Sequence, residues 1–268
     1  RYKFIFDLKD KYIKRVLFLS LPVFVGVAIN DLNAIIDRTL ASSLVSGSIS
    51  ALNYANKLNS LILGVFISAI TTVIFPLLSK ESTSDNIHGM KKIMKQGVNL
   101  ILLITIPATV GLIVLARPIV EVAFERGEFD VFATEMTSKA LIFYALGLVS
   151  MSLRLLITKV YYSLQDTKTP MINGAISVGF NIVLNLILVK FMAHAGLALA
   201  TSIAITIATL LMFYDLKKKI GSLGTKSYMV TFVKSGLASI IMGVTSYTIY
   251  NVLYRILGVS KLYNLISL

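Results

Sequence analysis

The sequence predicts an all-α, polytopic membrane bundle of about seven transmembrane helices, and three observations support this fold class. Hydrophobic residues make up 56% of the 268 residues, charged residues make up only 15%, and the mean hydropathy is +0.81. Soluble domains carry about 25% charged residues. Apolar runs long enough to cross a hydrocarbon core of ~30 Å recur along most of the chain. Basic residues gather at alternate ends of these runs, as they do in membrane proteins.

Seven candidate spans follow a basic segment, residues 1–15, which we expect at the cytoplasmic surface of a membrane. The spans lie near residues 16–44, 49–77, 97–116, 133–161, 170–192, 195–216 and 230–257. The stretch 117–130 mixes apolar and charged residues over a length too short to span, so we expect it in the outer interface.

The charges of the connecting segments predict the orientation. Sixteen Lys and Arg residues lie in one alternating set of ends, at 1–15, 78–97, 159–170 and 217–226. The other set, at 43–50, 117–130, 190–194 and beyond 254, carries only five. Because positive residues favour the cytoplasmic side, the amino end of this chain is predicted to be cytoplasmic.

The composition also excludes several functions. The chain has no Cys, which excludes disulfides, cysteine metal sites and thiol catalysis. It has no HExxH motif, Walker loop or Ser/His/Asp set, and we expect His88 and His194 to be solvated loop residues, so enzyme activity is not predicted. The net charge of +13 does not indicate nucleic-acid binding, because the basic residues cluster at segment ends and not on one face.

Polar residues interrupt the first span, from Pro22 to Leu44, at mid-depth. Asn30, Asn33 and Asp37 fall on one helical stripe, and Asp31 and Arg38 fall on an adjacent one. An ionisable group at the centre of a spanning helix costs roughly 2.5–3.5 kcal/mol on insertion scales. The first two spans therefore predict the wall of a polar transport cavity.

A second polar array lies on the fifth span, where Asn173, Ser177, Asn181 and Asn185 recur every fourth residue. If the first, fifth and sixth spans meet, Asp37, Asn181, Asn185 and Thr201 supply oxygen ligands that suit a monovalent cation. Hydrogen bonding between helices explains the same residues equally well. The sequence leaves both interpretations open.

A third array is cationic. The basic residues outside the loops are Arg38, Lys57, Lys139, Arg154 and Lys234. Lys139 and Lys234 lie close enough to span ends to extend toward water, and Arg38 has Asp31 and Asp37 as possible partners. Lys57 and Arg154 have no acidic neighbour at helical spacing, so an anionic substrate is their candidate partner.

These residues lie in segments that resemble the MurJ (MviN) family of lipid II flippases, in the multidrug/oligosaccharidyl-lipid/polysaccharide exporter superfamily. The resemblance covers essentially the whole chain and rests on SLPVFVGVAINDLNAIIDRTLASSL, SGSISALNYANKLNSLILGVF, IFPLLSK, YYSLQDTKTP and AGLALATSIA. It implies a protein of fourteen spans in two lobes plus two extra helices, of which this chain matches spans seven to thirteen. Residues 16–216 then form the six-helix second lobe, and 217–268 form a cytoplasmic loop plus one further helix. Both ends look cut, and the partner is the missing amino-terminal lobe.

The family resemblance implies flipping of lipid II, a polyprenyl-diphosphate-linked precursor, from the inner to the outer leaflet of the bacterial cytoplasmic membrane by alternating access. Lys57, Arg154 and Arg38 are the candidate substrate-binding residues, and Lys57 stands where the family usually has Arg. Asp37, Asn181, Asn185 and Thr201 match a sodium site of some members, in which an acid can stand at the position of Asn185. Transport is then coupled to sodium and membrane potential.

Three alternatives stay open. A flippase for another polyprenyl-diphosphate glycan needs the same cations. A drug/cation antiporter favours acidic cavity groups over Lys57 and Arg154. A non-transporting membrane scaffold needs no buried Asp37, Lys57 or Arg154, so apolar residues at all three positions should leave its function intact.

Overall fold

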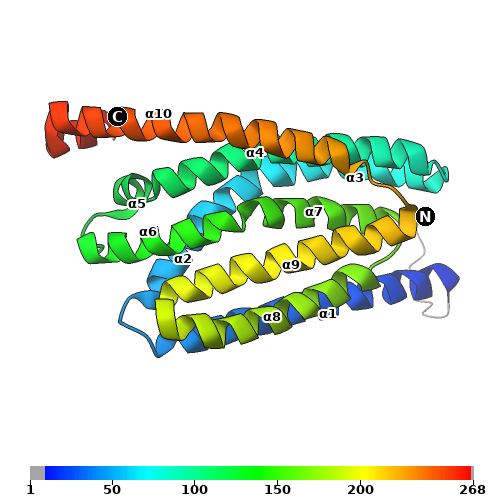
Figure 1. Cartoon of the computed structure of the whole chain (residues 1–268). Helices are drawn as coiled ribbons and strands as arrows, with labels where there is room; N and C mark the ends of the chain where they lie inside the picture. Colours follow the sequence, from blue (N-terminus) through cyan, green and yellow to red (C-terminus); the bar gives the residue numbers. More distant parts are fainter. Residues whose placement is uncertain (1–9, 267–268) are drawn as a thin grey trace, which may run out of the picture.

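The structure is a computed structural model that describes residues 10–266, with side chains described as far as Arg255. Residues 1–9 of the predicted basic segment and residues 267–268 lie outside the described residues. The elements are α1 (Lys11–Ser42), α2 (Ser48–Ile62), the π-helical turn η1 (Leu63–Ile67), α3 (Ser68–Thr83), α4 (Ile87–Val114), α5 (Ala116–Phe124), α6 (Val131–Leu146), α7 (Leu148–Ser163), α8 (Lys168–Met192), α9 (His194–Ile220) and α10 (Thr225–Ile266) (Figure 1).

The predicted all-α membrane bundle is confirmed. Within residues 10–266, six continuous helical stretches are long and apolar enough to cross a membrane, and the pair α6 and α7 makes a seventh when it is counted as one span. The two helices of that pair are bent by 47°. The bend lies at Gly147, where a Cβ would stand 2.9 Å from the Cα of Ser202 in α9. The Ser202 hydroxyl donates to the Phe143 carbonyl at 2.6 Å, which satisfies an acceptor beside the bend.

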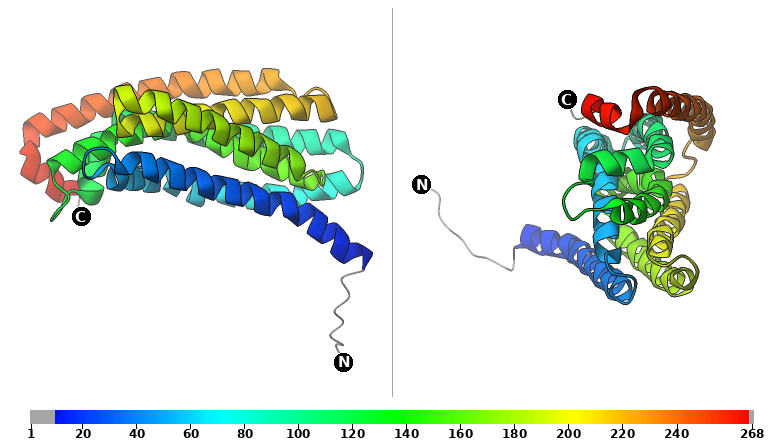
Figure 2. Two further views of the ribbon diagram at one scale, coloured as in Figure 1. Left: turned by 90° about the horizontal axis from the view of Figure 1, so that it is seen from below. Right: turned by 90° about the vertical axis from the view of Figure 1, so that its left-hand side faces the viewer.

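The helices run roughly side by side (Figures 1 and 2). The hairpin of α8 and α9 packs against α1, while α2 packs on α6, and α4 lies between α3, α7 and α10. One core cluster joins α3, α4, α7 and α9, with Leu78, Met94, Leu156 and Met212 fully buried. A second joins α1, α2, α4, α5, α6 and α9 through small side chains such as Ala55. Large hydrophobic side chains, among them many on α8 and α10, remain exposed, as lipid contact requires.

The turn between α8 and α9 brings the two backbones into direct contact at Gly196. A Cβ at this position would stand 2.5 Å from the carbonyl oxygen of Leu188. Because the contacted atom is backbone, it cannot move aside as a side chain does. We expect Gly196→Ala to lower the free energy of unfolding by about 1–3 kcal/mol. Thermal unfolding in detergent measures this, and Gly179→Ala on α8 is the control, since its Cβ would meet nothing within 4 Å. Equal melting temperatures for the two variants would contradict the expected contact.

The loop between α7 and α8 is fastened to two distant helix ends. Asp166 accepts hydrogen bonds from the Thr169 amide at 3.0 Å and hydroxyl at 2.8 Å, and it forms an ion pair with Lys219 of α9 at 2.6 Å. Gln165 accepts a hydrogen bond from Arg15 of α1. Burial raises the pKa of Asp166, but the hydrogen bonds from Lys219 and Thr169 outweigh it and hold the pKa below its usual 3.8. The ionised carboxylate therefore stabilises the fold.

We expect Asp166→Asn to lower stability at neutral pH by about 1–3 kcal/mol, the usual effect of losing hydrogen bonds to a charged group. Since the folded-state pKa lies below the unfolded value of about 3.9, this contribution is complete above that pH. It disappears as the pH falls through the folded-state pKa. Melting curves of both proteins should therefore differ at pH 6 and converge once the pH falls below the folded-state pKa of Asp166. A difference in melting temperature that does not change with pH would show that ionisation of Asp166 plays no part.

The sequence predicted that both histidines lie in loops, but the structure places both in helices. His88 lies in the first turn of α4 and is exposed. His194 begins α9, is buried, and its Nε2 lies 3.0 Å from the Met136 carbonyl oxygen. The prediction that His194 is solvated was wrong, because the tight turn after α8 places its ring against α6. The stretch 117–130 contains α5, and its place in the outer interface stays a prediction.

Candidate functional site

A polar cluster joins α1, α8 and α9 inside the bundle. Asn185 Nδ2 donates to Asp37 Oδ1 at 2.6 Å and lies 2.9 Å from Asn181 Oδ1. Asn181 Nδ2 lies 3.2 Å from Thr201 Oγ1, and Asn33 Nδ2 lies 3.4 Å from Asp37 Oδ2. The sequence placed Asp37, Asn181, Asn185 and Thr201 on three separate helices, and the structure brings these four residues together. They meet because Asp37, Asn181 and Asn185 occupy facing stripes of two packed helices.

One buried oxygen of this cluster lacks a hydrogen-bond donor among the described residues. This atom is Asn185 Oδ1, which is buried and accepts no hydrogen bond from any residue that the structure describes. The Asn181 amide makes better contacts when turned over, with its oxygen 3.2 Å from Thr201 Oγ1 and its nitrogen 3.1 Å from Asp37 Oδ1. A buried acceptor without a donor is costly, and a cation relieves that cost. Among the described residues no three His, Cys, Asp or Glu side chains gather as metal ligands. A single carboxylate among amide and hydroxyl oxygens thus fits a monovalent cation.

A small cavity of about 130 Å³ adjoins this cluster. Its polar lining residues are Asp37, Arg38, Asn53, Asn56 and Tyr144. Arg38 is exposed and, within the described part of the chain, forms no salt bridge with Asp31 or Asp37. The possible pairing of Arg38 with either acid is therefore not observed.

Lys57 lies on the exposed face of α2. Its Nζ stands 5.2 Å from the ring centroid of Tyr54, a cation–π contact, and it lines an open hollow of about 440 Å³ with Phe124. This polar face, which α1 and α2 share, consists of the exposed residues Asn30, Asp31, Arg38, Asn53, Asn56, Lys57 and Ser60. Charged and amide side chains on a spanning segment are too costly to face lipid. The polar face therefore belongs against water or against another part of a protein.

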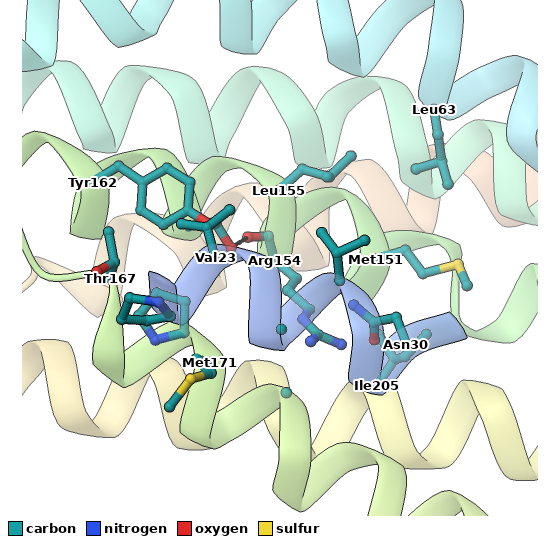
Figure 3. A pocket seen from close by; sticks show the side chains of 16 residues that line it. Val23, Asn30, Leu63, Met151, Arg154, Leu155, Tyr162, Thr167, Met171 and Ile205 are labelled. Atoms are coloured by element: carbon teal, nitrogen blue, oxygen red, sulfur yellow. Dashed lines mark hydrogen bonds between the residues drawn. The ribbon is translucent and has the colours of Figure 1, made fainter. Parts of the chain in front are cut away.

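Arg154 lies elsewhere, in a separate pocket of about 350 Å³ between α1, α7 and α8 (Figure 3). The three candidate substrate-binding cations thus line three different cavities that share no lining residue. The sequence pointed to Arg154 and, on a separate stripe, to Asn30, but not to their meeting with Tyr162 and Gly174 around one pocket. No signal along one helix could reveal them, because they come from three elements brought together by tertiary packing.

The fold and the site together define a multi-pass, α-helical membrane protein of the transporter class. The sequence matches the family "Lipid II flippase MurJ" over residues 1–266, and the chain belongs to this family. It is 39% identical to a probable lipid II flippase MurJ of Vibrio cholerae over 208 residues, which is 78% of this chain and 40% of that protein. It is 34% identical to one of Haemophilus influenzae, over 88% of this chain and 47% of that protein. The chain thus spans less than half the length of these relatives.

Solved structures give the same result. A lipid II flippase MurJ in an inward closed conformation aligns with a TM-score of 0.68 and 31% identity, covering 95% of this chain and 57% of that one. A MOP superfamily transporter from Pyrococcus furiosus aligns with a TM-score of 0.68 at 17% identity, over 90% of this chain and 56% of that one. The second likeness concerns the fold alone. The candidate spans and the family together identify this chain as part of a multi-pass bacterial membrane protein.

Proposed function

We propose that the protein moves lipid II from the inner to the outer leaflet of the bacterial cytoplasmic membrane. The observation that carries this proposal is the polar face of α1 and α2, where Lys57 and Arg38 are exposed within segments hydrophobic enough on average to cross a membrane. Family membership supports the substrate, since the relatives of this chain are named lipid II flippases. The cations attract the diphosphate of the head group, with Lys57 acting as a point charge and Arg38 as a fork of donors.

The mechanism we propose is alternating access between this bundle and the amino-terminal lobe that its relatives carry. With the cytoplasm negative, outward transfer of an anionic head group is favoured by roughly 2.3 kcal/mol per charge per 100 mV. Cavity cations stabilise the head group after it leaves water, while exposed, hydrated positions such as Lys57 hold it loosely enough for release. The charge distribution of the loops supports a cytoplasmic amino end for this chain.

We further propose that Asp37, Asn181, Asn185 and Thr201 hold a sodium ion. The orphan oxygen of Asn185 and the single carboxylate of Asp37 favour this over hydrogen bonding alone. An acid in place of Asn185 would strengthen the site, so the site of this chain is a weak one. Bound sodium supplies positive charge between α1 and α8, through which an inward ion gradient can reset the empty carrier.

The alternatives differ in what they require of these residues. A glycan flippase for another polyprenyl diphosphate uses the same cations and differs only in head group. A drug/cation antiporter is disfavoured, because Lys57, Arg38 and Arg154 outnumber Asp31 and Asp37 around the three cavities and the polar face. A scaffold tolerates apolar residues at Asp37, Lys57 and Arg154.

Complementation decides among these candidates. The complete gene is expressed in a bacterium depleted of its own flippase, and lipid II exposed on the outer surface is measured. Growth with externally accessible lipid II supports the proposal. Growth without a change in accessible lipid II, or growth with all three residues made apolar, supports a scaffold instead.

A further inference from the structure

We propose that a pocket at the end of the bundle where α1 finishes binds a primary ammonium group that is carried on a short aliphatic chain. This acidic pocket has a volume of about 360 Å³ and lies between the α1–α2 turn, the first turns of α2, the α5–α6 loop and the first turns of α6 (Figure 1). It shares no lining residue with the three other cavities or with the polar face of α1 and α2. The proposal therefore does not rest on the proposed flipping function.

The charged residues that line the acidic pocket are all acidic. They are Glu128 and Asp130, and no Lys or Arg lines it. Glu128 forms no salt bridge or hydrogen bond with a described residue. Asp130 caps α6 with one oxygen, since its Oδ1 accepts a hydrogen bond from the Ala133 amide at 2.8 Å, and its second oxygen has no partner in the described part of the chain. Both acids are exposed, and as a pair alone they would be an ordinary solvated surface.

A buried hydroxyl without a partner lies in the same lining. Thr137 is fully buried, and its Oγ1 has no hydrogen-bond partner among the described residues. The next residue of α6 differs, because the Ser138 hydroxyl donates to the Thr134 carbonyl at 2.6 Å. Leaving a buried hydroxyl unpaired is costly, and a ligand that donates a hydrogen bond relieves that cost.

Aromatic rings form one wall of the acidic pocket. Tyr54 and Phe129 both line it, and their rings pack edge to face with centroids 5.2 Å apart. Ala51 and Met136 add buried apolar surface to the lining. Ring faces attract organic cations, and apolar surface attracts methylene groups. The pocket therefore suits an aliphatic chain as well as a positive charge.

This combination favours an ammonium over a metal ion. Among the residues that the structure describes, no three His, Cys, Asp or Glu side chains gather, and a hydrated metal ion gains nothing from rings and methylene groups. A primary ammonium places three N–H donors on one compact charge. The pocket offers it Glu128, the second oxygen of Asp130 and Thr137 Oγ1, which are acceptors without donors. The volume is at the small end of the range of ligand sites, so the chain behind the ammonium is short.

The ammonium can belong to a free amine or to the head group of a membrane lipid. Phe132 lines the acidic pocket and is 56% exposed, so apolar surface continues outward from it. A lipid can place its chain along this surface, whereas a small free amine cannot. n-Butylammonium is the probe for the free amine, and lysophosphatidylethanolamine is the probe for the lipid. Lysophosphatidylglycerol is the matched lipid without an ammonium.

The test measures how fast a single cysteine at Ser46, an exposed lining residue, is modified by the neutral reagent methyl methanethiosulfonate. It uses a form of the complete protein that carries no other cysteine, in detergent at constant ionic strength. We expect n-butylammonium to slow the modification and n-butanol, its uncharged counterpart, to leave the rate unchanged. Glu128→Gln should weaken binding roughly two- to fivefold, and so should Asp130→Asn, which keeps the cap of α6.

Thr137→Val separates a ligand contact from a structural role. It should weaken binding about two- to tenfold, because it removes an acceptor of the ammonium. It should not lower the melting temperature without ligand, since the hydroxyl has no partner in the described part of the chain. Glu135→Gln is the control, because it removes an exposed carboxylate of α6 that does not line the acidic pocket, and it should leave binding unchanged.

Stronger protection by lysophosphatidylethanolamine than by n-butylammonium, with none by lysophosphatidylglycerol, assigns the acidic pocket to a lipid head group. Equal protection by the two ammonium probes assigns it to a free amine. The proposal is overturned if neither ammonium probe protects, if n-butanol protects as well as n-butylammonium, or if the double variant Glu128→Gln/Asp130→Asn keeps full protection. Unchanged binding in Thr137→Val also overturns it, because only a solvated acidic surface would remain. No arm measures flipping, so failure here is distinct from failure of the proposed function.

Discussion

Lys57→Ala in the complete gene is expected to slow the outward movement of lipid II strongly in cells depleted of their own flippase. Lys57 is exposed on a spanning segment, and its contact with the Tyr54 ring leaves the ammonium free to meet an anion. A hydrogen bond to a charged group contributes about 1.5–3 kcal/mol, so its loss slows transport roughly ten- to a hundredfold or more. Lipid II accessible on the cell surface, together with growth, is the readout.

Two controls make this result specific to charge at that position. Lys57→Arg should keep transport, since it preserves the charge and adds a bidentate fork. Lys234→Ala removes an exposed cation from α10, away from the polar face, and should have no effect. Full transport by Lys57→Ala, at equal protein levels, would remove Lys57 from the substrate path.

Asp37→Asn is expected to eliminate stabilisation of the purified protein by sodium. Ligand at 100 times its dissociation constant stabilises a protein by about 2.7 kcal/mol. For a chain of this size that corresponds to a rise in melting temperature of roughly 5–10 °C. The comparison is sodium chloride against choline chloride at equal concentration. Without the carboxylate the site offers only neutral oxygens, and the difference should vanish.

The neighbouring residues sharpen this test. Asn185→Asp places a second carboxylate beside the half-buried Asp37 carboxylate and should shift the response to lower sodium concentrations. Glu135→Gln removes an exposed carboxylate that pairs with Lys139, and this variant is the control. A sodium response that survives Asp37→Asn unchanged would mean that hydrogen bonding alone accounts for the cluster. Sodium-dependent transport in that variant would likewise remove the proposed coupling.

The sequence predicted the bundle because the property that defines a span is local. Each run of apolar residues needs only its own length and hydropathy to be recognised, and seven runs correspond to the helical stretches of the structure. The bend between α6 and α7 was not predicted. It depends on Ser202 of α9 approaching Gly147, a contact that neither segment encodes alone.

In the candidate site, too, the sequence predicted what depends on one helix and not what depends on the packing between helices. Asn181 and Asn185 lie one turn apart, so a helical wheel places them on one face, and their meeting with Asp37 and Thr201 was predicted as a possibility. The separation of Arg154 from Lys57 and Arg38 was not foreseen. Their placement depends on how each helix is rotated against its neighbours. The sequence of one helix cannot show whether an unpaired cation lies in a cavity or on the surface.

The central claim is that the polar face of α1 and α2 borders water at membrane depth. The given chain contains no Cys, so single cysteines are introduced at Asn56 and Ser60, and at the exposed Val183 of α8 for comparison, in a form of the complete protein that carries no other cysteine. A charged methanethiosulfonate is applied to the complete protein in membranes, and labelling is measured. We predict rapid labelling at Asn56→Cys and Ser60→Cys and none at Val183→Cys. Absence of labelling at all three positions would contradict the account, because the face would then be closed to water.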